Sequence, residues 1–309
     1  MTTKIRRRTI GLTLAAAASA MLALTIGNTT ASPKLDPASA TAADDRLQQL
    51  SERIGGTVRQ RRAGEILQYH QTQDHIKACM STAGWDYTPP VFVDMYAGKQ
   101  RLIMGTGAGR WMAPLTPNGL GIAEQHRRLA AFDQDNTPNP GYAKLSPADQ
   151  DRYAAALTGC APRVQRDVNF PTKSHELNVL FLRMIDNAEK DPHVADLGKT
   201  YGPCMAAAGT PAWDYEDLIA KTQQEIGQAA PGNANPSGPA WEKAVAHERT
   251  AAAADARCRA TIRDAALTLV GPAADKFTST YAADIEQAQQ DWEALIAEAM
   301  KYPEGRMYL

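Results

Sequence analysis

The sequence contains few aromatic residues, few cysteines and no long apolar run beyond its first part. Aromatic residues make up 6% of the 309-residue chain, with only 5 Phe and 4 Cys. Aromatic and β-branched residues favour strands, whereas alanine, which is abundant here, is the strongest helix former. The composition therefore predicts an all-α protein. No apolar run after residue 27 reaches the roughly 20 residues that cross a bilayer, so no further membrane span is expected.

Acidic residues are missing from residues 1–31. This segment opens with "MTTKIRRR", continues as an uncharged apolar run from Thr9 to Gly27 and ends at "NTTAS", an order typical of a secretory signal peptide. A membrane anchor is the alternative, but the run is rich in Ala, Thr and Gly. We predict a signal peptide over 1–31, cleaved after Ala31 or, alternatively, after Ala40. No Cys near the exit could carry a lipid, and the Arg run leaves Sec and twin-arginine export both open.

The mature chain is expected to be acidic. The predicted signal peptide holds 4 of the 33 basic residues and none of the 34 acidic ones, which leaves a net charge of −5. A general nucleic-acid binder needs a basic surface. The charge balance therefore argues against a nucleic-acid partner.

The four cysteines, Cys79, Cys160, Cys204 and Cys258, are at least 44 residues apart. Zinc sites commonly use close pairs such as C-x2-C, so neither a metal site nor a cofactor is expected. Outside the cell, an even number of cysteines is typical of disulfides. Three pairings are possible, and spacing alone does not choose among them.

The chain after the signal peptide begins with a Pro-containing linker, residues 32–43, which is expected to be disordered. Helical periodicity starts at Asp44 and is interrupted by an irregular segment, 85–145, rich in Gly and Pro. Helical patterns then resume at "SPADQDRYAAALTGC" and "SHELNVLFLRMIDNAEKD", where Ser146 and Ser174 are expected N-caps.

Two long helical patterns, 239–270 and 272–300, end the chain. The apolar residues of the second recur at steps of three and four, as in a coiled-coil seam. We therefore expect the two helices to pair as an antiparallel hairpin whose second helix begins at Pro272.

One motif is written twice, as "CMSTAGWDY" from Cys79 and as "CMAAAGTPAWDY" from Cys204. Each copy places a Cys near the end of a helical pattern, just before a Gly that stops it. Each half of the chain then offers a second Cys, so the economical pairing joins Cys79 with Cys160 and Cys204 with Cys258. Closing loops of this length stabilises a fold by up to about 4 kcal/mol in the chain-entropy model.

The repeat predicts two diverged, disulfide-stapled helical modules, residues 44–168 and 169–309. In each, the Trp and Tyr of the Trp-Asp-Tyr sequence are expected to cover the disulfide with apolar surface. The alternative is a ligand site made of these aromatics together with Asp86 or Asp214.

The repeated Cys-Met, small-residue, Gly and aromatic motif resembles a group of secreted proteins and lipoproteins of actinobacteria. The stretches "YAKLSPADQDRYAAALTGC" and "AAADARCRAT" share this resemblance. It covers most of the mature chain in outline and implies an exported, helical, Cys-stapled protein. The group has no established activity, so the resemblance implies no reaction. The chain departs from the lipoprotein members because it lacks the lipidated Cys.

Motifs of the common hydrolases are missing. G-x-S-x-G and S-x-x-K are absent, and disulfides leave no thiol nucleophile. A zinc protease needs H-E-x-x-H, but "HERTA" at His247 has Ala251 in place of the second His. The histidines of "HQTQDH", His70 and His75, are five residues apart. We interpret both stretches as solvated helix positions.

The Gly-rich stretch "MGTGAGRW" ends at Trp111 but completes no phosphate-binding motif. We interpret it as an exposed loop and as the best candidate for a binding loop, through Arg110, Trp111 and Met112. Acid pairs such as Asp133 with Asp135, or Asp149 with Asp151, are candidates for glycosidase chemistry, which uses two carboxyl groups across a sugar.

The sequence thus predicts a secreted, non-catalytic binding or structural protein of the extracellular space or cell envelope. Its expected partner is a cell-wall polymer or a secreted protein. The contact surfaces expected are the terminal hairpin and the 85–145 region. Two alternatives stay open: a hydrolase of cell-wall or polysaccharide material that uses paired carboxylates, and an inhibitor or accessory factor of a co-secreted enzyme.

Overall fold

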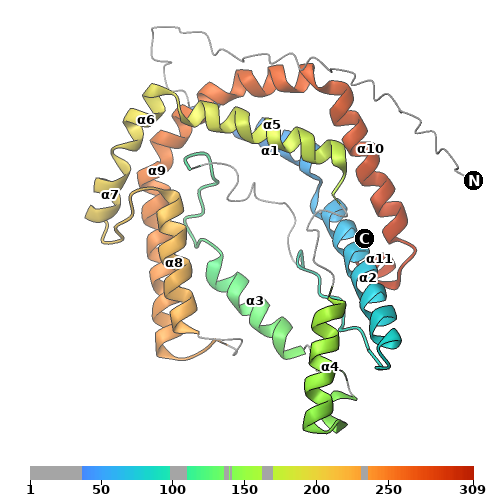
Figure 1. The fold of residues 1–309 in the computed structure, drawn as a ribbon. Helices are drawn as coiled ribbons and strands as arrows, with labels where there is room; N and C mark the ends of the chain where they lie inside the picture. Colours follow the sequence, from blue (N-terminus) through green and yellow to red (C-terminus); the bar gives the residue numbers. More distant parts are fainter. Residues whose placement is uncertain (1–36, 98–109, 136–138, 140, 162–169, 231–235) are drawn as a thin grey trace, which may run out of the picture. The chain divides into compact units, whose positions relative to one another are not determined.

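The computed structural model describes residues 37–97, 110–135, 139, 141–161, 170–230 and 236–309. Over these residues the protein is all-helical and contains no strand, which confirms the predicted fold class (Figure 1). No helix among them is long and apolar enough to span a membrane. The predicted signal peptide lies outside the described residues.

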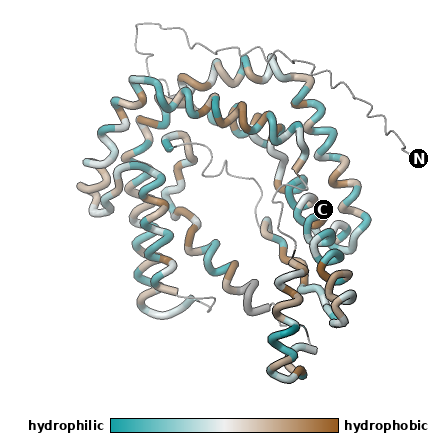
Figure 2. The backbone as a smooth tube through the Cα atoms, viewed as in Figure 1, coloured by the Kyte–Doolittle hydropathy of each residue, from teal (hydrophilic) through white to brown (hydrophobic). Residues whose placement is uncertain are grey.

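In chain order the α-helices are α1 (Pro37–Gly55), α2 (Val58–Thr82), α3 (Ile122–Asp135), α4 (Pro147–Cys160), α5 (Thr172–Glu189), α6 (Pro192–Gly198), α7 (Tyr201–Ala207), α8 (Tyr215–Ala229), α9 (Pro239–Thr280), α10 (Ala282–Ala299) and α11 (Pro303–Tyr308), and a 3₁₀ turn spans Tyr142–Lys144. Apolar and polar residues are interspersed along these helices (Figure 2). Such amphipathic helices are stable once their apolar stripes are covered.

Helix α1 begins inside the segment that was predicted as a disordered linker, so that prediction is wrong from Pro37 onward. The reason is packing. Ala40 and Ala43 are buried, and a Cβ added at Gly271 of α9 would lie 3.3 Å from the Ala43 Cβ. Small residues on both helices thus let α1 lie closely against α9. Signal cleavage after Ala31 would leave α1 whole, whereas cleavage after Ala40 would remove its first turn.

The predicted terminal hairpin is also wrong, because α9 continues as one helix through Pro272 and ends only at Thr280. Proline within a helix removes one backbone hydrogen bond and bends the helix without necessarily ending it, and α9 is bent (Figure 1). Helix α10 then packs mainly along α2 and α5 rather than back along α9. Its predicted apolar seam is buried against helices from earlier in the chain.

The main core joins helices from both halves of the sequence. Leu47 and Ile54 of α1 lie in one cluster with Leu177 of α5 and with Ile262 and Leu267 of α9. The described residues group as one compact unit. These contacts cross the module boundary that was expected near residue 168, because α1, from the first half, buries its apolar stripe on α9, from the second half.

The turn between α1 and α2 is fixed by Trp292 of α10. Gly56 has φ +83°, and a Cβ there would lie 2.8 Å from the indole of Trp292. The Trp292 Nε1–H donates to the Ile54 carbonyl at 3.1 Å, and the buried Ser174 hydroxyl donates to the same oxygen. Ser174 was expected to cap α5, but α5 starts at Thr172, so Ser174 is a helix-interior residue that pins α1 instead.

The structure confirms both disulfides. Cys79–Cys160 and Cys204–Cys258 have Cα–Cα distances of 5.6 and 5.7 Å, which lie in the usual range. The first joins α2 to α4, and the second joins α7 to α9.

The repeated Cys-Met-x3-Gly sequence forms the same helix ending twice. Gly84 and Gly209 have φ of 81° and 78°, and the N–H of the residue after each Gly donates to the carbonyl of the fully buried Met, at 2.9 and 3.1 Å. The Gly N–H groups also bond three residues back. This is the Schellman pattern of helix C-termini, so the repeat encodes how α2 and α7 end.

The aromatics after these Gly residues behave differently in the two copies. Trp85 and Tyr87 pack against the cluster around Cys79–Cys160, as predicted. Tyr215 is buried in the same core cluster as Cys258, but Trp213 is 72% exposed. The prediction that Trp213 covers the second disulfide is therefore wrong.

Candidate functional site

The segment Arg110–Pro114, which follows the Gly-rich stretch, is held by two side chains of opposite charge. Glu189, at the end of α5, accepts the N–H groups of its first three residues at 2.6–2.8 Å. Arg259 of α9 donates to three of its carbonyl oxygens. Burial raises the pKa of the Glu189 carboxyl, and the three N–H donors act in the opposite direction. The backbone of this segment is thus fixed from both sides.

The expected binding loop is divided by this arrangement. Trp111 is 6% exposed and Met112 is fully buried, so they are core residues and the prediction of an exposed loop is wrong for both. Gly198 of α6 makes room for the indole, because a Cβ there would lie 2.8 Å from Trp111. Arg110 stays half exposed and forms an ion pair with Asp214, with 3.2 Å between Nε and Oδ2. The preceding residues 98–109 lie outside the described residues.

Arg259 belongs to a buried polar network with a structural role. Arg259 and Asp255 are both fully buried, with Nε–Oδ1 and Nη2–Oδ2 distances of 2.9 and 2.6 Å. The Tyr201 hydroxyl donates to Asp255 at 2.8 Å, and the pKa of Tyr201 is raised by burial and by this carboxylate. The guanidinium of Arg259 donates all of its N–H groups to Asp255 and to carbonyl oxygens of the 110–114 segment, so no donor is left for a ligand.

Trp213 is the centre of a surface that we call the Trp213 surface, formed by Arg110, Trp213 and Lys221. The Lys221 ammonium lies 5.2 Å from the centroid of the Trp213 ring. The Trp213 backbone N–H donates to Asp217 at 3.0 Å, and Lys221 bonds both Asp217 and the Pro211 carbonyl, at 2.8 and 3.0 Å. Asp214 is the N-cap of α8, and its carboxylate accepts the Asp217 N–H at 2.8 Å. An exposed indole is thus carried on a fixed backbone.

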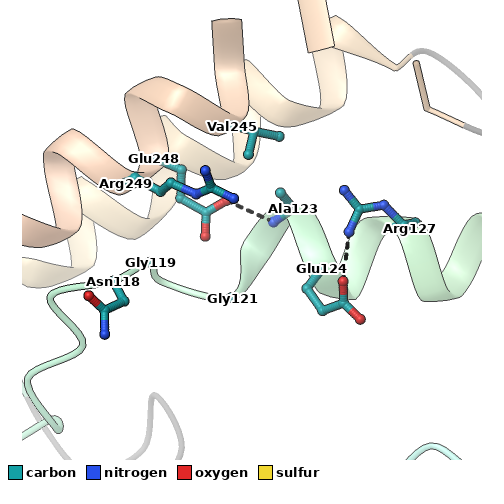
Figure 3. A pocket seen from close by; sticks show the side chains of 9 residues that line it. All are labelled: Asn118, Gly119, Gly121, Ala123, Glu124, Arg127, Val245, Glu248 and Arg249. Atoms are coloured by element: carbon teal, nitrogen blue, oxygen red, sulfur yellow. Dashed lines mark hydrogen bonds and ion pairs between the residues drawn. The ribbon is translucent and has the colours of Figure 1, made fainter. Parts of the chain in front are cut away.

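A pocket of about 310 Å³ lies between the start of α3 and the side of α9 (Figure 3). Glu124 and Arg127 line it from α3, and Glu248 and Arg249 line it from α9. Glu248 is 4% exposed and accepts the N–H groups of the first two residues of α3 at 2.9 and 3.0 Å. A carboxylate from α9 therefore does the work of an N-cap for α3.

Replacing Glu248 with alanine is expected to lower the free energy of unfolding by about 1–2 kcal/mol, as loss of a helix cap does. The two N–H groups at the start of α3 would lose their acceptor. Urea denaturation followed by circular dichroism measures the change. Arg249→Ala is the control, because Arg249 is the exposed neighbour on the same helix. Equal stability of the two variants would contradict this role of Glu248.

The two acids that line the pocket, Glu124 and Glu248, are both hydrogen-bonded within the protein. Hydrogen bonds from Arg128 and Arg127 lower the pKa of Glu124, and Glu248 is bound to helix N–H groups. A glycosidase acid needs a raised pKa. Glu189 and Asp264 have raised pKa values because of burial, but neither lines the pocket.

The acid pairs singled out in the sequence do not form a site in the described residues. Asp149 is bonded to Ser146 and Arg152, which lower its pKa, and Asp151 is exposed on the same helix. The side chains of the other pair, Asp133 and Asp135, lie outside the described set.

Histidines are placed mostly as expected. His75 and His247 are exposed, but His70 is half-buried, stacks on Tyr302 and lies 2.7 Å from Glu304. Among the described residues, no group of three or more His, Cys, Asp or Glu side chains is arranged to hold a metal ion.

Sequence reasoning missed the roles of Glu189, Glu248 and Arg259. Each acts on backbone groups far away in the chain, so no local pattern marks it. The signal for Lys221 was present, because Asp217 and Lys221 are four residues apart on one helix.

The chain matches no protein-family model, no curated protein and no solved structure. Function is therefore inferred from the residues described above.

Proposed function

We propose that this is a secreted, non-catalytic binding protein of the extracellular space or cell envelope, which attaches to its target through the Trp213 surface. The observation that carries the proposal is the 72% exposure of Trp213 on a hydrogen-bonded backbone. The signal-like first residues and the two disulfides support the extracellular part of the proposal.

An exposed Trp ring suits binding because it offers a large, rigid area with little entropy to lose. Trp is among the residues that most often dominate the energy of interfaces. Here the backbone of Trp213 is held by Asp217, and Asp217 is in turn held by Lys221. Such preorganisation lowers the cost of ordering a binding group. The other described Trp residues are buried or partly buried.

The proposal predicts that the mature protein sediments with purified cell walls of the producing organism and releases no soluble sugar or peptide. Trp213→Ala is expected to weaken this binding by about tenfold or more, since a good aromatic contact contributes about 0.5–1.5 kcal/mol beyond its buried area. Wall-bound and free protein are measured over a range of wall concentrations.

Met307→Ala is the matched control, because Met307 is also 72% exposed but lies on α11. Release of sugar or peptide would replace the proposal with the hydrolase alternative. Absence of binding would contradict the proposal and favour an inhibitor or accessory factor that acts on a soluble enzyme.

A further inference from the structure

We propose that the Cys204–Cys258 disulfide is a site of thiol–disulfide exchange, at which a protein dithiol attacks the sulfur of Cys204. The Cys79–Cys160 disulfide, in contrast, serves the fold alone. This inference goes beyond the proposed function and does not depend on it, because it concerns only the surroundings of the two disulfides.

The four cysteines differ in their exposure to solvent. Cys204 is exposed, whereas its partner Cys258 is only 9% exposed. In the first disulfide, Cys79 is half-buried and Cys160 is 3% exposed. A thiolate must reach the sulfur that it attacks, and exposed disulfides are typically the labile, regulatory or catalytic ones. The exposure of Cys204 therefore singles out the second disulfide.

The two copies of the repeated motif cover their disulfides differently. In the first copy, Trp85 and Tyr87 pack with Cys79 in the apolar cluster around Cys160. In the second copy, Trp213 occupies the place of Trp85 but is 72% exposed, so it buries little of its surface on any neighbour. Tyr215, the counterpart of Tyr87, is buried with Cys258 in the main core. The motif thus shields the inner sulfur of the second disulfide and leaves the outer one without its aromatic cover.

The neighbours of Cys204 on α7 leave room for a large reactant. Pro203, Ala206 and Ala207 are exposed, and all three side chains are small. A protein thiol needs such space, because the backbone that carries the attacking sulfur must come close to the disulfide. Helix α7 therefore places no long side chain in the path to Cys204.

The geometry of the reaction also selects Cys204 as the attacked residue. In thiol–disulfide exchange the entering sulfur approaches along the S–S axis, opposite the leaving sulfur. Cys258 lies within α9 and belongs to the main core, so attack on its sulfur would have to reach a buried atom. Attack on Cys204 starts from solvent and makes Cys258 the leaving group.

The exchange balances with a dithiol as the reductant. The thiolate of the dithiol forms a bond with the Sγ of Cys204. The Cys204–Cys258 bond breaks, and its electron pair leaves on Cys258, which takes up a proton. The second thiol of the dithiol then displaces Cys204 in the same way. The dithiol is oxidised by two electrons to a disulfide, and its two protons end on the two cysteine thiols.

Helix α7 is held on α9 without the disulfide. Tyr201 and Met205 of α7 are fully buried, and the Tyr201 hydroxyl donates to Asp255 of α9 at 2.8 Å. The second disulfide can thus open and close while the protein stays folded. In α4, by comparison, the buried residues are Tyr153 and Cys160. The first disulfide supplies one of these two anchors, which suits a purely structural bond.

Reduction of the native protein with dithiothreitol tests the proposal. Samples are quenched with acid, alkylated with N-ethylmaleimide and mapped by mass spectrometry. The second disulfide is expected to be reduced about tenfold or more faster than the first, whose sulfurs must wait for a local opening. The helical circular dichroism signal should stay unchanged during this first reduction. Equal rates, or faster reduction of Cys79–Cys160, would overturn the inference.

Two further thiols show which sulfur is attacked and by what class of reactant. Reduced glutathione, a monothiol, is expected to form its adduct on Cys204 and to leave Cys258 free for alkylation. A thioredoxin whose resolving cysteine is replaced by serine is expected to be captured through Cys204. An adduct mainly on Cys258 would overturn the assignment of the attacked sulfur. Reaction with glutathione but no capture of thioredoxin would overturn the choice of a protein dithiol.

Variants separate the cover of a disulfide from its chemistry. Trp85→Ala is expected to speed reduction of the first disulfide by about tenfold, because it removes an aromatic residue from the cluster around Cys160. Reduction of the second disulfide in the same variant is the internal control and should not change. An unchanged rate at the first disulfide would contradict the role of aromatic cover.

Paired serine substitutions complete the test. The variant with Cys204→Ser and Cys258→Ser is expected to keep its helical signal and to capture no thioredoxin. The matched variant with Cys79→Ser and Cys160→Ser should still capture thioredoxin through Cys204. Loss of helical structure in the first variant would show that the second disulfide cannot open in a folded protein, and this would overturn the inference.

Discussion

Replacing Arg259 with methionine is expected to lower the free energy of unfolding by about 3–5 kcal/mol, the cost of removing one partner from a buried ion pair. Asp255 would remain as a buried carboxylate whose remaining described partner is the Tyr201 hydroxyl. Three carbonyl oxygens of the 110–114 segment would also lose a donor. Urea denaturation of the oxidised protein measures the change.

Arg257→Met is the control for this prediction. Arg257 lies two residues before Arg259 on α9 but is exposed, so its replacement should change the free energy of unfolding by no more than about 0.5 kcal/mol. If the two variants were equally stable, the network around Asp255 would not hold the 110–114 segment.

Trp111→Ala is expected to lower the free energy of unfolding by about 3–5 kcal/mol, as truncation of a buried aromatic residue does. Trp111 is 6% exposed, meets the ring of Tyr201 edge-on at 5.5 Å and occupies the space left by Gly198. Its removal would leave a cavity between α6, α7 and the 110–114 segment. Chemical denaturation measures the loss. It is followed by far-ultraviolet circular dichroism, which reports the helices and not the tryptophan that has been removed.

The same substitution at Trp213 provides the contrast. Trp213→Ala should change the free energy of unfolding by no more than about 0.5 kcal/mol, because the ring is 72% exposed. A large loss of stability at Trp213 together with a small loss at Trp111 would show that Trp213 is the core residue and Trp111 the surface residue.

Local sequence signals predicted the local structure well. Ser146 and Asp214 cap α4 and α8 as their sequences indicate, because a cap depends on residues within one turn. The Gly residues that end α2 and α7 were recognised for the same reason. The disulfide pairing was also predicted, since each half of the chain contains two cysteines and the simplest arrangement joins the two within each half.

The wrong predictions involve long-range packing. Pro272 was taken as a break, but packing of α9 against α1 carries the helix through it. Trp111 was assigned to the surface because it ends a Gly-rich stretch, and Trp213 was assigned to the core because it was expected to cover the second disulfide. Glu189 and Arg259 decide the position of Trp111 from 78 and 148 residues away. No local pattern contains that information.

The packing of α1 on α9 has a consequence for the order of folding. The ion pair between Asp44 and Arg263 joins residues 219 positions apart, and contacts of such separation form late because loop closure must come first. During synthesis, α1 has no α9 to cover its apolar stripe until the last third of the chain is available. We therefore expect the apolar stripe of α1 to stay unpacked until α9 has been made. The first disulfide, Cys79–Cys160, lies entirely ahead of the second in the chain and can close while the later helices are still emerging.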